Sequence, residues 1–213
     1  MNPTRKLRVT IPQRTGELVL ALALGLSGLT GPAAWAQTTP PAIERMLQPG
    51  PEAERLVQRA GTWNVVIMLW PAPDAQPIVW RDLVAERRMV GLFLEEVIRP
   101  AAGSRQSDFR RVSYLTYNKV QGRWEYVSMD TRFPAGIMPA TSIDRGNSER
   151  ITLEFESVAF PGWGEAVDGW MLRSSYELDL TSNNAEVARQ HWTRADGTGR
   201  RWLGVQFDYT RQR

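Results

Sequence analysis

The sequence has no cysteine, two lysines and one histidine among 213 residues, and each shortage excludes a kind of structure or site. Without cysteine the chain can form no disulfide and carry no lipid on an N-terminal cysteine, so an exported product must be stabilised by its core alone. The single histidine, His191, lacks the partner residues that a zinc site or a histidine-based catalytic triad requires. We therefore expect no metal site.

The N-terminus has the three parts of an export signal. An apolar stretch over residues 18–29 is followed by the cleavage pattern Ala34-Trp35-Ala36, which predicts a mature start at Gln37. The apolar stretch, at roughly 12 residues, is short of the about 20 needed to span a bilayer, although an uncleaved anchor is the alternative. We predict a signal peptide over residues 1–36 and a periplasmic or secreted product with no stable membrane insertion. The basic residues ahead of the apolar stretch are Arg5, Lys6, Arg8 and Arg14.

The basic character of the whole chain comes mainly from this signal. Its removal takes four of the 26 basic residues and one of the 23 acidic residues, which leaves 22 of each. The mature protein is then neutral, so the isoelectric point near 9.6 does not indicate a nucleic-acid partner. The remaining 177 residues suffice for one sizeable core. We predict a flexible leader over residues 37–50 and a single domain over residues 51–213.

The domain is expected to begin with a short helix. Residues 42–47 favour a helical turn, and Pro51 suits the first position of a second helix. Gly61 then ends the helical period. The predicted apolar face of this helix consists of Ala53, Leu56, Val57 and Ala60.

From residue 62 onward the hydrophobic period is two, which is typical of β-strands. Short strands separated by turn residues predict an all-β fold, an antiparallel up-and-down β-barrel of about ten strands. Apolar residues alternate with polar ones most regularly in the last strands, and the expected inward residues include Ile151, Leu153, Phe155, Trp170, Leu172, Tyr176, Leu178, Leu203, Val205, Phe207 and Tyr209. The expected strands are 62–70, 78–90, 92–99, 108–118, 123–131, 136–144, 150–159, 170–180, 185–194 and 201–211.

Three stretches of the domain form a recognisable pattern. They are residues 56–63 (Leu-Val-Gln-Arg-Ala-Gly-Thr-Trp), 114–118 (Tyr-Leu-Thr-Tyr-Asn) and 123–131 (Arg-Trp-Glu-Tyr-Val-Ser-Met-Asp-Thr), with a Gly-Ile-Met turn after the last. Together they resemble the bacterial domain-of-unknown-function family 1579. The resemblance covers roughly residues 50–211 and implies a lipocalin-like, calycin-type barrel. Where such members have Trp-x-Asp in the fifth strand, this chain keeps Asp130 but has Ser128 in place of the tryptophan. The family has no settled activity to lend.

The resemblance also implies how the barrel closes. Calycin barrels commonly pack a tryptophan of the first strand against an arginine near the end of the last. Trp63 and Arg211 are the matching residues here, and a cation–π contact of about 0.5 to 2 kcal/mol would hold them together. We expect this pair to be structural.

Candidate ligand contacts come from strand alternation. Tyr126, Ser128 and Asp130 share one side of their strand with Trp124, and if that side faces the lumen they are polar groups inside an apolar cup. Tyr176 lies on the apolar side of its own strand. These four polar residues would orient a small apolar molecule, although Asp130 could instead cap the turn at residues 131–136.

Other residues carry alternatives. Trp163, in the Gly-rich loop 160–169, is a candidate lid residue that contacts the ligand, or else an aromatic side chain that packs there. His191 could bind haem iron if it faced the lumen, and it faces outward if Trp192 points in. Glu154 and Glu156 are expected on a solvated face, and the adjacent Glu95 and Glu96 on opposite faces.

The function that the sequence favours is an exported barrel that binds a small, largely apolar molecule without a cofactor. The alternatives are a haem-binding barrel using His191, a hydrolase or isomerase using Asp130 as base, and a structural barrel whose lumen is filled by its own side chains.

Overall fold

A nine-residue helix, α2 (Pro51–Arg59), leads into the first strand. Pro51 stands in its first turn together with Glu52 and Glu54, which suit the positive end of the helix dipole. The preceding helix, α1 (Ala42–Leu47), lies within the predicted leader and buries none of its residues. The computed structural model describes residues 41–213 apart from 107, 134, 146–148, 160–166 and 180–183.

The buried face of α2 differs from the predicted one. Ala53 and Leu56 are buried as expected, but Val57 is 57% exposed. The residue that turns inward is Arg59, which is 5% exposed and pairs with the carboxylate of Glu186 on a distant strand. The prediction for Val57 was wrong because an arginine with a buried partner can occupy a position that hydrophobicity alone would leave to solvent.

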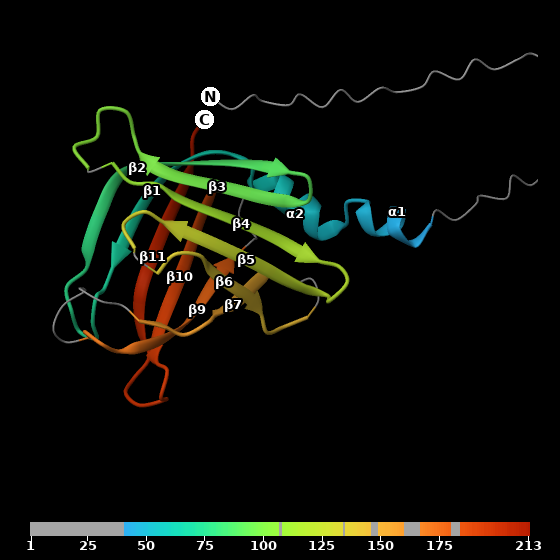
Figure 1. The fold of residues 1–213 in the computed structure, drawn as a ribbon. Coiled ribbons are helices and arrows are strands. Elements are labelled where there is room, and N and C mark those ends of the chain that lie inside the picture. Colours follow the sequence, from blue (N-terminus) through green and yellow to red (C-terminus); the bar gives the residue numbers. More distant parts are fainter. Residues whose placement is uncertain (1–40, 107, 134, 146–148, 160–166, 180–183) are drawn as a thin grey trace, which may run out of the picture. The chain divides into compact units, whose positions relative to one another are not determined.

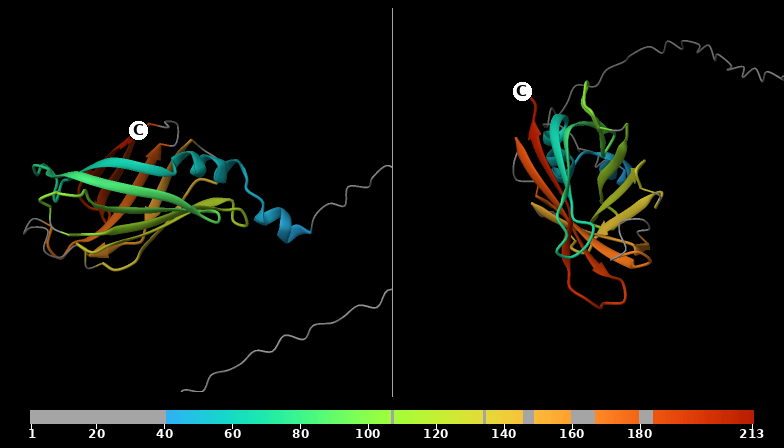
Figure 2. Two further views of the ribbon diagram at one scale, coloured as in Figure 1. Left: turned by 90° about the horizontal axis from the view of Figure 1, so that it is seen from above. Right: turned by 90° about the vertical axis from the view of Figure 1, so that its left-hand side faces the viewer.

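Ten strands form a closed antiparallel ring, which confirms the predicted barrel (Figure 1). Each ring strand pairs with its neighbours in sequence, β7 pairs with β9 across the two-residue β8, and β11 returns to β1. The two views in Figure 2 show the strands wrapped around a common interior, with α2 at one end. The strands are β1 (Gly61–Leu69), β2 (Ile78–Val90), β3 (Phe93–Pro100), β4 (Arg111–Asn118), β5 (Arg123–Asp130), β6 (Met138–Ser142), β7 (Arg150–Phe155), β8 (Val158–Ala159), β9 (Met171–Asp179), β10 (Ala185–Arg194) and β11 (Trp202–Arg211).

Most predicted strands differ from the observed ones by one or two residues at an end, and two differ by more. The run at 150–159 is divided into β7 and β8, with Glu156 and Ser157 between them. The run expected from residue 108 begins as β4 only at Arg111. Before β4 the alternation of buried and exposed residues already runs from Asp108, but strand pairing begins only at Arg111, so alternation alone extended this strand too far.

A bulge in β11 reverses the facing of its first residues. Gln190 pairs with Val205 and His191 with Leu203, so Gly204 is the extra residue on β11. As a result Trp202 is buried and Leu203 half-buried, opposite to the predicted alternation. A Cβ at position 204 would lie 2.3 Å from the ring of Trp192, so only glycine leaves room for that buried tryptophan.

The corner between α2, β1 and β11 contains the predicted Trp63–Arg211 contact. The two residues are register partners, and the guanidinium carbon of Arg211 lies 4.3 Å from the centre of the Trp63 ring. Nη1 of Arg211 also donates to the carbonyl of Ala60 at 2.7 Å. Gly61 has φ +127°, and a Cβ there would lie 2.8 Å from Nη1 of Arg211. The glycine therefore makes room for the arginine that covers this end of the barrel.

The helices that the structure describes include none with the length and apolar character needed to cross a membrane.

Candidate functional site

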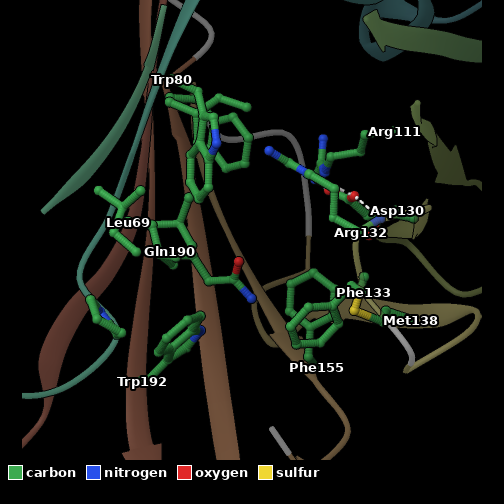
Figure 3. A pocket seen from close by; sticks show the side chains of 16 residues that line it. Leu69, Trp80, Arg111, Asp130, Arg132, Phe133, Met138, Phe155, Gln190 and Trp192 are labelled. Atoms are coloured by element: carbon green, nitrogen blue, oxygen red, sulfur yellow. Dashed lines mark hydrogen bonds and ion pairs between the residues drawn. The ribbon is translucent and has the colours of Figure 1, made fainter. Parts of the chain in front are cut away.

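The barrel encloses a cavity of about 340 Å³ in the half that lies away from α2. Pro71 is half-buried and Ile78 exposed, so the cavity reaches solvent near the start of β2. Figure 3 shows Trp80, Leu69, Gln190 and Trp192 along one side, facing Asp130, Arg132, Phe133, Met138 and Phe155 along the other. The described residues that line it are Ile67, Leu69, Pro71, Ile78, Trp80, Arg111, Ser128, Asp130, Arg132, Phe133, Met138, Phe155, Gln190, Trp192, Val205 and Phe207.

Two of the predicted ligand contacts, Ser128 and Asp130, line this cavity. Asp130 accepts hydrogen bonds from Nε and Nη2 of Arg132 at 3.0 and 2.7 Å, and from the backbone N–H of Arg132 at 2.9 Å. Burial opposes ionisation of Asp130, but the hydrogen bonds and charge of Arg132 outweigh it, so the pKa of this carboxyl lies below its ordinary value. Asp130 thus both lines the cavity and caps the turn after β5.

Arg132 is held between two aromatic rings. Its guanidinium carbon lies 3.8 Å from the centre of the Phe109 ring and 4.8 Å from that of Trp80. Nη1 of Arg132 is buried and has no hydrogen-bond partner. The side chain is therefore fixed in place by stacking and by Asp130 while one nitrogen retains an unused donor.

Arg111, which the sequence reading did not single out, marks the inner end of the cavity. It stands directly opposite Asp130 in the β4–β5 register. Nη2 donates to the hydroxyl of Tyr126 at 2.5 Å, Nη1 donates to Glu96 at 3.3 Å, and the guanidinium lies 4.8 Å from the centre of the Phe207 ring. Arg111 therefore connects the cavity to a second group of charges beneath α2.

This second group is a buried ion cluster formed by Arg59, Arg87, Glu96 and Glu186. Arg87 donates to Glu96 and to Glu186, each at 2.7 Å, and Arg59 also pairs with Glu186. Burial opposes the charge on Glu96, but Arg87 and Arg111 outweigh it and keep the pKa of the carboxyl below its ordinary value. The sequence did hold a signal for this cluster, because these strand residues occupy the apolar phase of their strands, as Arg87 does after Leu83 and Ala85.

Tyr126 and Tyr176, the other predicted strand contacts, lie deeper than the large cavity. Both line a smaller space of about 30 Å³ next to the ion cluster. Their rings are 5.6 Å apart between centres, and Tyr176 packs edge-on against Phe207. Burial raises the pKa of the Tyr176 hydroxyl, which keeps it neutral. Tyr126 contacts two residues that line the large cavity, Arg111 through the hydrogen bond and Phe155 through an edge-on ring contact at 5.8 Å.

His191 lies on the outer wall of the barrel. Its inward-facing neighbours Gln190 and Trp192 line the cavity, whereas Nδ1 of His191 is 3.4 Å from Glu177, on the outer side of β9. Burial and Arg201 hold the pKa of His191 below its ordinary value despite Glu177. The imidazole is thus not placed to ligate a group inside the cavity.

The remaining sequence expectations concern Trp163, the paired carboxylates and metal ligands. Trp163 lies outside the described residues. Glu95 and Glu96 face opposite sides as expected, with Glu95 bonded to Tyr114 at 2.6 Å. Among the residues that the structure describes, no group of three His, Asp or Glu side chains is arranged to hold a metal ion.

Comparisons with known proteins extend this description only slightly. No protein family and no curated protein matches the chain in sequence, so the likeness to family 1579 stays a resemblance. The crystal structure of Rv2717c from M. tuberculosis is similar, with a TM-score of 0.47 and 17% sequence identity over 78% of this chain and 100% of that one. So distant a likeness carries no argument about activity.

Proposed function

We propose that this protein is an exported carrier that binds a small, largely apolar molecule inside its barrel. The observation that carries the proposal is the cavity of about 340 Å³, which falls within the range of about 300–1,000 Å³ common for small-molecule sites. Of the 16 described residues that line the cavity, eleven are apolar and five of these are aromatic, which suits the exclusion of water from an apolar ligand. The aromatic ones are Trp80, Phe133, Phe155, Trp192 and Phe207.

A few polar groups are available to set the orientation of the ligand. Ser128, Asp130 and Gln190 stand in the lining together with Arg111 and Arg132. The amide of Gln190 donates to the hydroxyl of Ser174 at 2.9 Å, which fixes its orientation. Such a small number of immobilised polar groups in an apolar wall is the usual arrangement for selecting one pose.

The same geometry gives less support to the other three candidate functions. A cavity of this volume speaks against a lumen filled by its own side chains. Asp130 is a weak candidate base, because its lowered pKa and its bonds to Arg132 stabilise the carboxylate. Haem ligation by His191 lacks an imidazole directed into the cavity.

Native mass spectrometry of the protein purified from its source organism tests the proposal. We expect a mass above that of the chain starting at Gln37, equal to one bound molecule. Val205→Phe, which fills part of the cavity, should remove that extra mass while circular dichroism stays unchanged. Val120→Phe, on an exposed turn, is the matched control and should retain it.

An empty cavity in the native protein, together with no binding of hydrophobic dyes or lipids, would overturn the proposal.

A further inference from the structure

Among the residues that the structure describes, those in the barrel interior carry one more positive than negative charge. Four arginines and two carboxylates line the two cavities. A third carboxylate, that of Glu186, pairs with two of these arginines. The buried tyrosines do not balance the difference, because burial raises the hydroxyl pKa values of Tyr176 and Tyr209 and keeps them neutral. The charged residues are Arg59, Arg87, Arg111 and Arg132 against Glu96, Asp130 and Glu186.

The surplus lies at Arg111, which lines the large cavity. Among the described residues, Arg132 is paired with Asp130, whereas Arg59, Arg87 and Arg111 share two carboxylates, Glu96 and Glu186. Arg111 reaches Glu96 only at 3.3 Å, while Arg87 holds the same carboxylate at 2.7 Å. A buried positive charge without a counterion is costly, since transfer from water removes its solvation and nothing replaces it.

The two arginines are also oriented to receive an anion. Phe207 lies against one guanidinium, and Phe109 and Trp80 against the other, so neither is free to swing away. Nη1 of Arg132 is a buried donor without an acceptor. An anionic head placed between them would supply both the missing charge and the missing acceptor.

Resting on the proposed function, we infer that the ligand is an organic anion. A carboxylate-type head lies against Arg111 and Arg132, within reach of Ser128, and an apolar body lies against Trp192, Phe155 and Met138. The bound complex is then neutral across the whole interior. A neutral apolar molecule would fill the same volume but leave the surplus charge buried and unpaired.

Calorimetric titration with matched acid and amide pairs tests this inference. The probes are decanoate against decanamide, and naphthalene-2-carboxylate against naphthalene-2-carboxamide. We expect at least one acid to bind about 10-fold or more tightly than its amide, as one or two charge-assisted hydrogen bonds would give. The better pair shows whether the body is a chain or a ring system.

Two substitutions should change acid binding in opposite directions. Arg132→Gln should weaken it about 10-fold, whereas Asp130→Asn should tighten it, because the asparagine can still accept from Arg132 but removes the opposing charge. Amide binding should hardly change in either variant. Arg110→Gln, an exposed residue next to Arg111, is the control and should leave both affinities unchanged. A merely structural role for Asp130 would not tighten acid binding.

The possible outcomes separate this inference from the proposed function. If acids and amides bind equally, or Asp130→Asn weakens acid binding, the cavity still binds apolar molecules but the inferred anion is wrong. If neither acids nor amides bind, the carrier proposal itself loses its support. Because Arg132 is half-buried and outside the ion cluster, its variant should remain folded when Arg111 variants do not.

Discussion

The two halves of this barrel use inward-facing residues in opposite ways. Beneath α2 the interior is filled by paired arginines and carboxylates, and the remaining space is about 30 Å³. In the other half aromatic and aliphatic side chains surround a cavity of about 340 Å³. The difference shows that the same strands of one closed sheet can form a filled half held together by buried ion pairs and an apolar half that contains a cavity. Strand β10 spans both, with Glu186 in the first half and Gln190 in the second.

The largest effect should come from breaking the ion cluster. Glu186→Gln leaves Arg59 and Arg87 buried without their shared carboxylate, which should cost about 3–5 kcal/mol in the free energy of unfolding. Gln190→Leu, on the same face of the same strand, should cost less than about 1.5 kcal/mol. Urea denaturation of both variants measures the contrast. Equal losses of unfolding free energy would mean that the half beneath α2 does not depend on its buried charges more than the other half depends on its polar groups.

The next largest effect concerns the β11 bulge in the open half. Gly204→Ala places a methyl group within 2.3 Å of the Trp192 ring, which should cost about 1–3 kcal/mol and displace a wall of the cavity. Thermal unfolding measures the loss of stability, and quenching of tryptophan fluorescence reports the displacement. Adding Trp192→Phe should recover part of the stability, and an absence of recovery would place the strain elsewhere.

A smaller effect is expected at the closed corner. Arg211→Ala removes the contact with Trp63 and the hydrogen bond to Ala60, and should cost about 1–2 kcal/mol. Ligand affinity should not change, because the corner lies in the half away from the cavity. Arg213→Ala, at the exposed end of the chain, is the control. A weakened affinity in the Arg211 variant would show that the two halves are coupled.

The smallest effect is the acid sensitivity contributed by Asp130. Its pKa is lowered in the folded protein, so its contribution to stability is complete above the unfolded value of about 3.9 and is lost as the pH falls through the folded pKa. Between pH 5 and 3, about one pH unit either side of that value, the free energy of unfolding of Asp130→Asn should therefore fall less steeply than that of the unchanged protein. Val120→Phe, on an exposed turn and without a titratable group, should follow the unchanged protein. If the free energy of unfolding of Asp130→Asn fell as steeply with pH as that of the unchanged protein, the lowered pKa of Asp130 would be contradicted.

Sequence patterns predict the fold better than the site, for a physical reason. Strand alternation depends on the period of apolar residues, so the ten ring strands could be read directly. Alternation also puts Ser128 and Asp130 on one side of their strand, but only the structure shows that this side lines the cavity. The ion cluster leaves one signal, the position of its strand residues in the apolar phase, which is easily missed because arginine and glutamate are treated as surface residues unless their partners are known. Glu186 and Arg59 are 127 positions apart, and only the folded chain brings them together.

Two wrong predictions have the same origin. The facing of Leu203 depended on a strict period of two, which the extra residue Gly204 interrupts. The burial of Val57 depended on hydrophobicity alone, whereas Arg59 took the inward position. Both errors concern tertiary partners, Trp192 and Glu186, that no local pattern reveals.

The short strand β6 is expected to open more readily than the other strands of the barrel. It has five residues, and its ladder with β7 covers only Ala140–Ser142. A short ladder opens at a lower free energy than the rest of a sheet, so its amides should exchange with solvent earlier than those of β10 or β11. Met138, at the start of β6, lines the cavity. Local opening of this one strand would therefore widen the cavity beside Met138 and ease the release of a bound molecule without unfolding of the barrel, and hydrogen exchange would measure that opening.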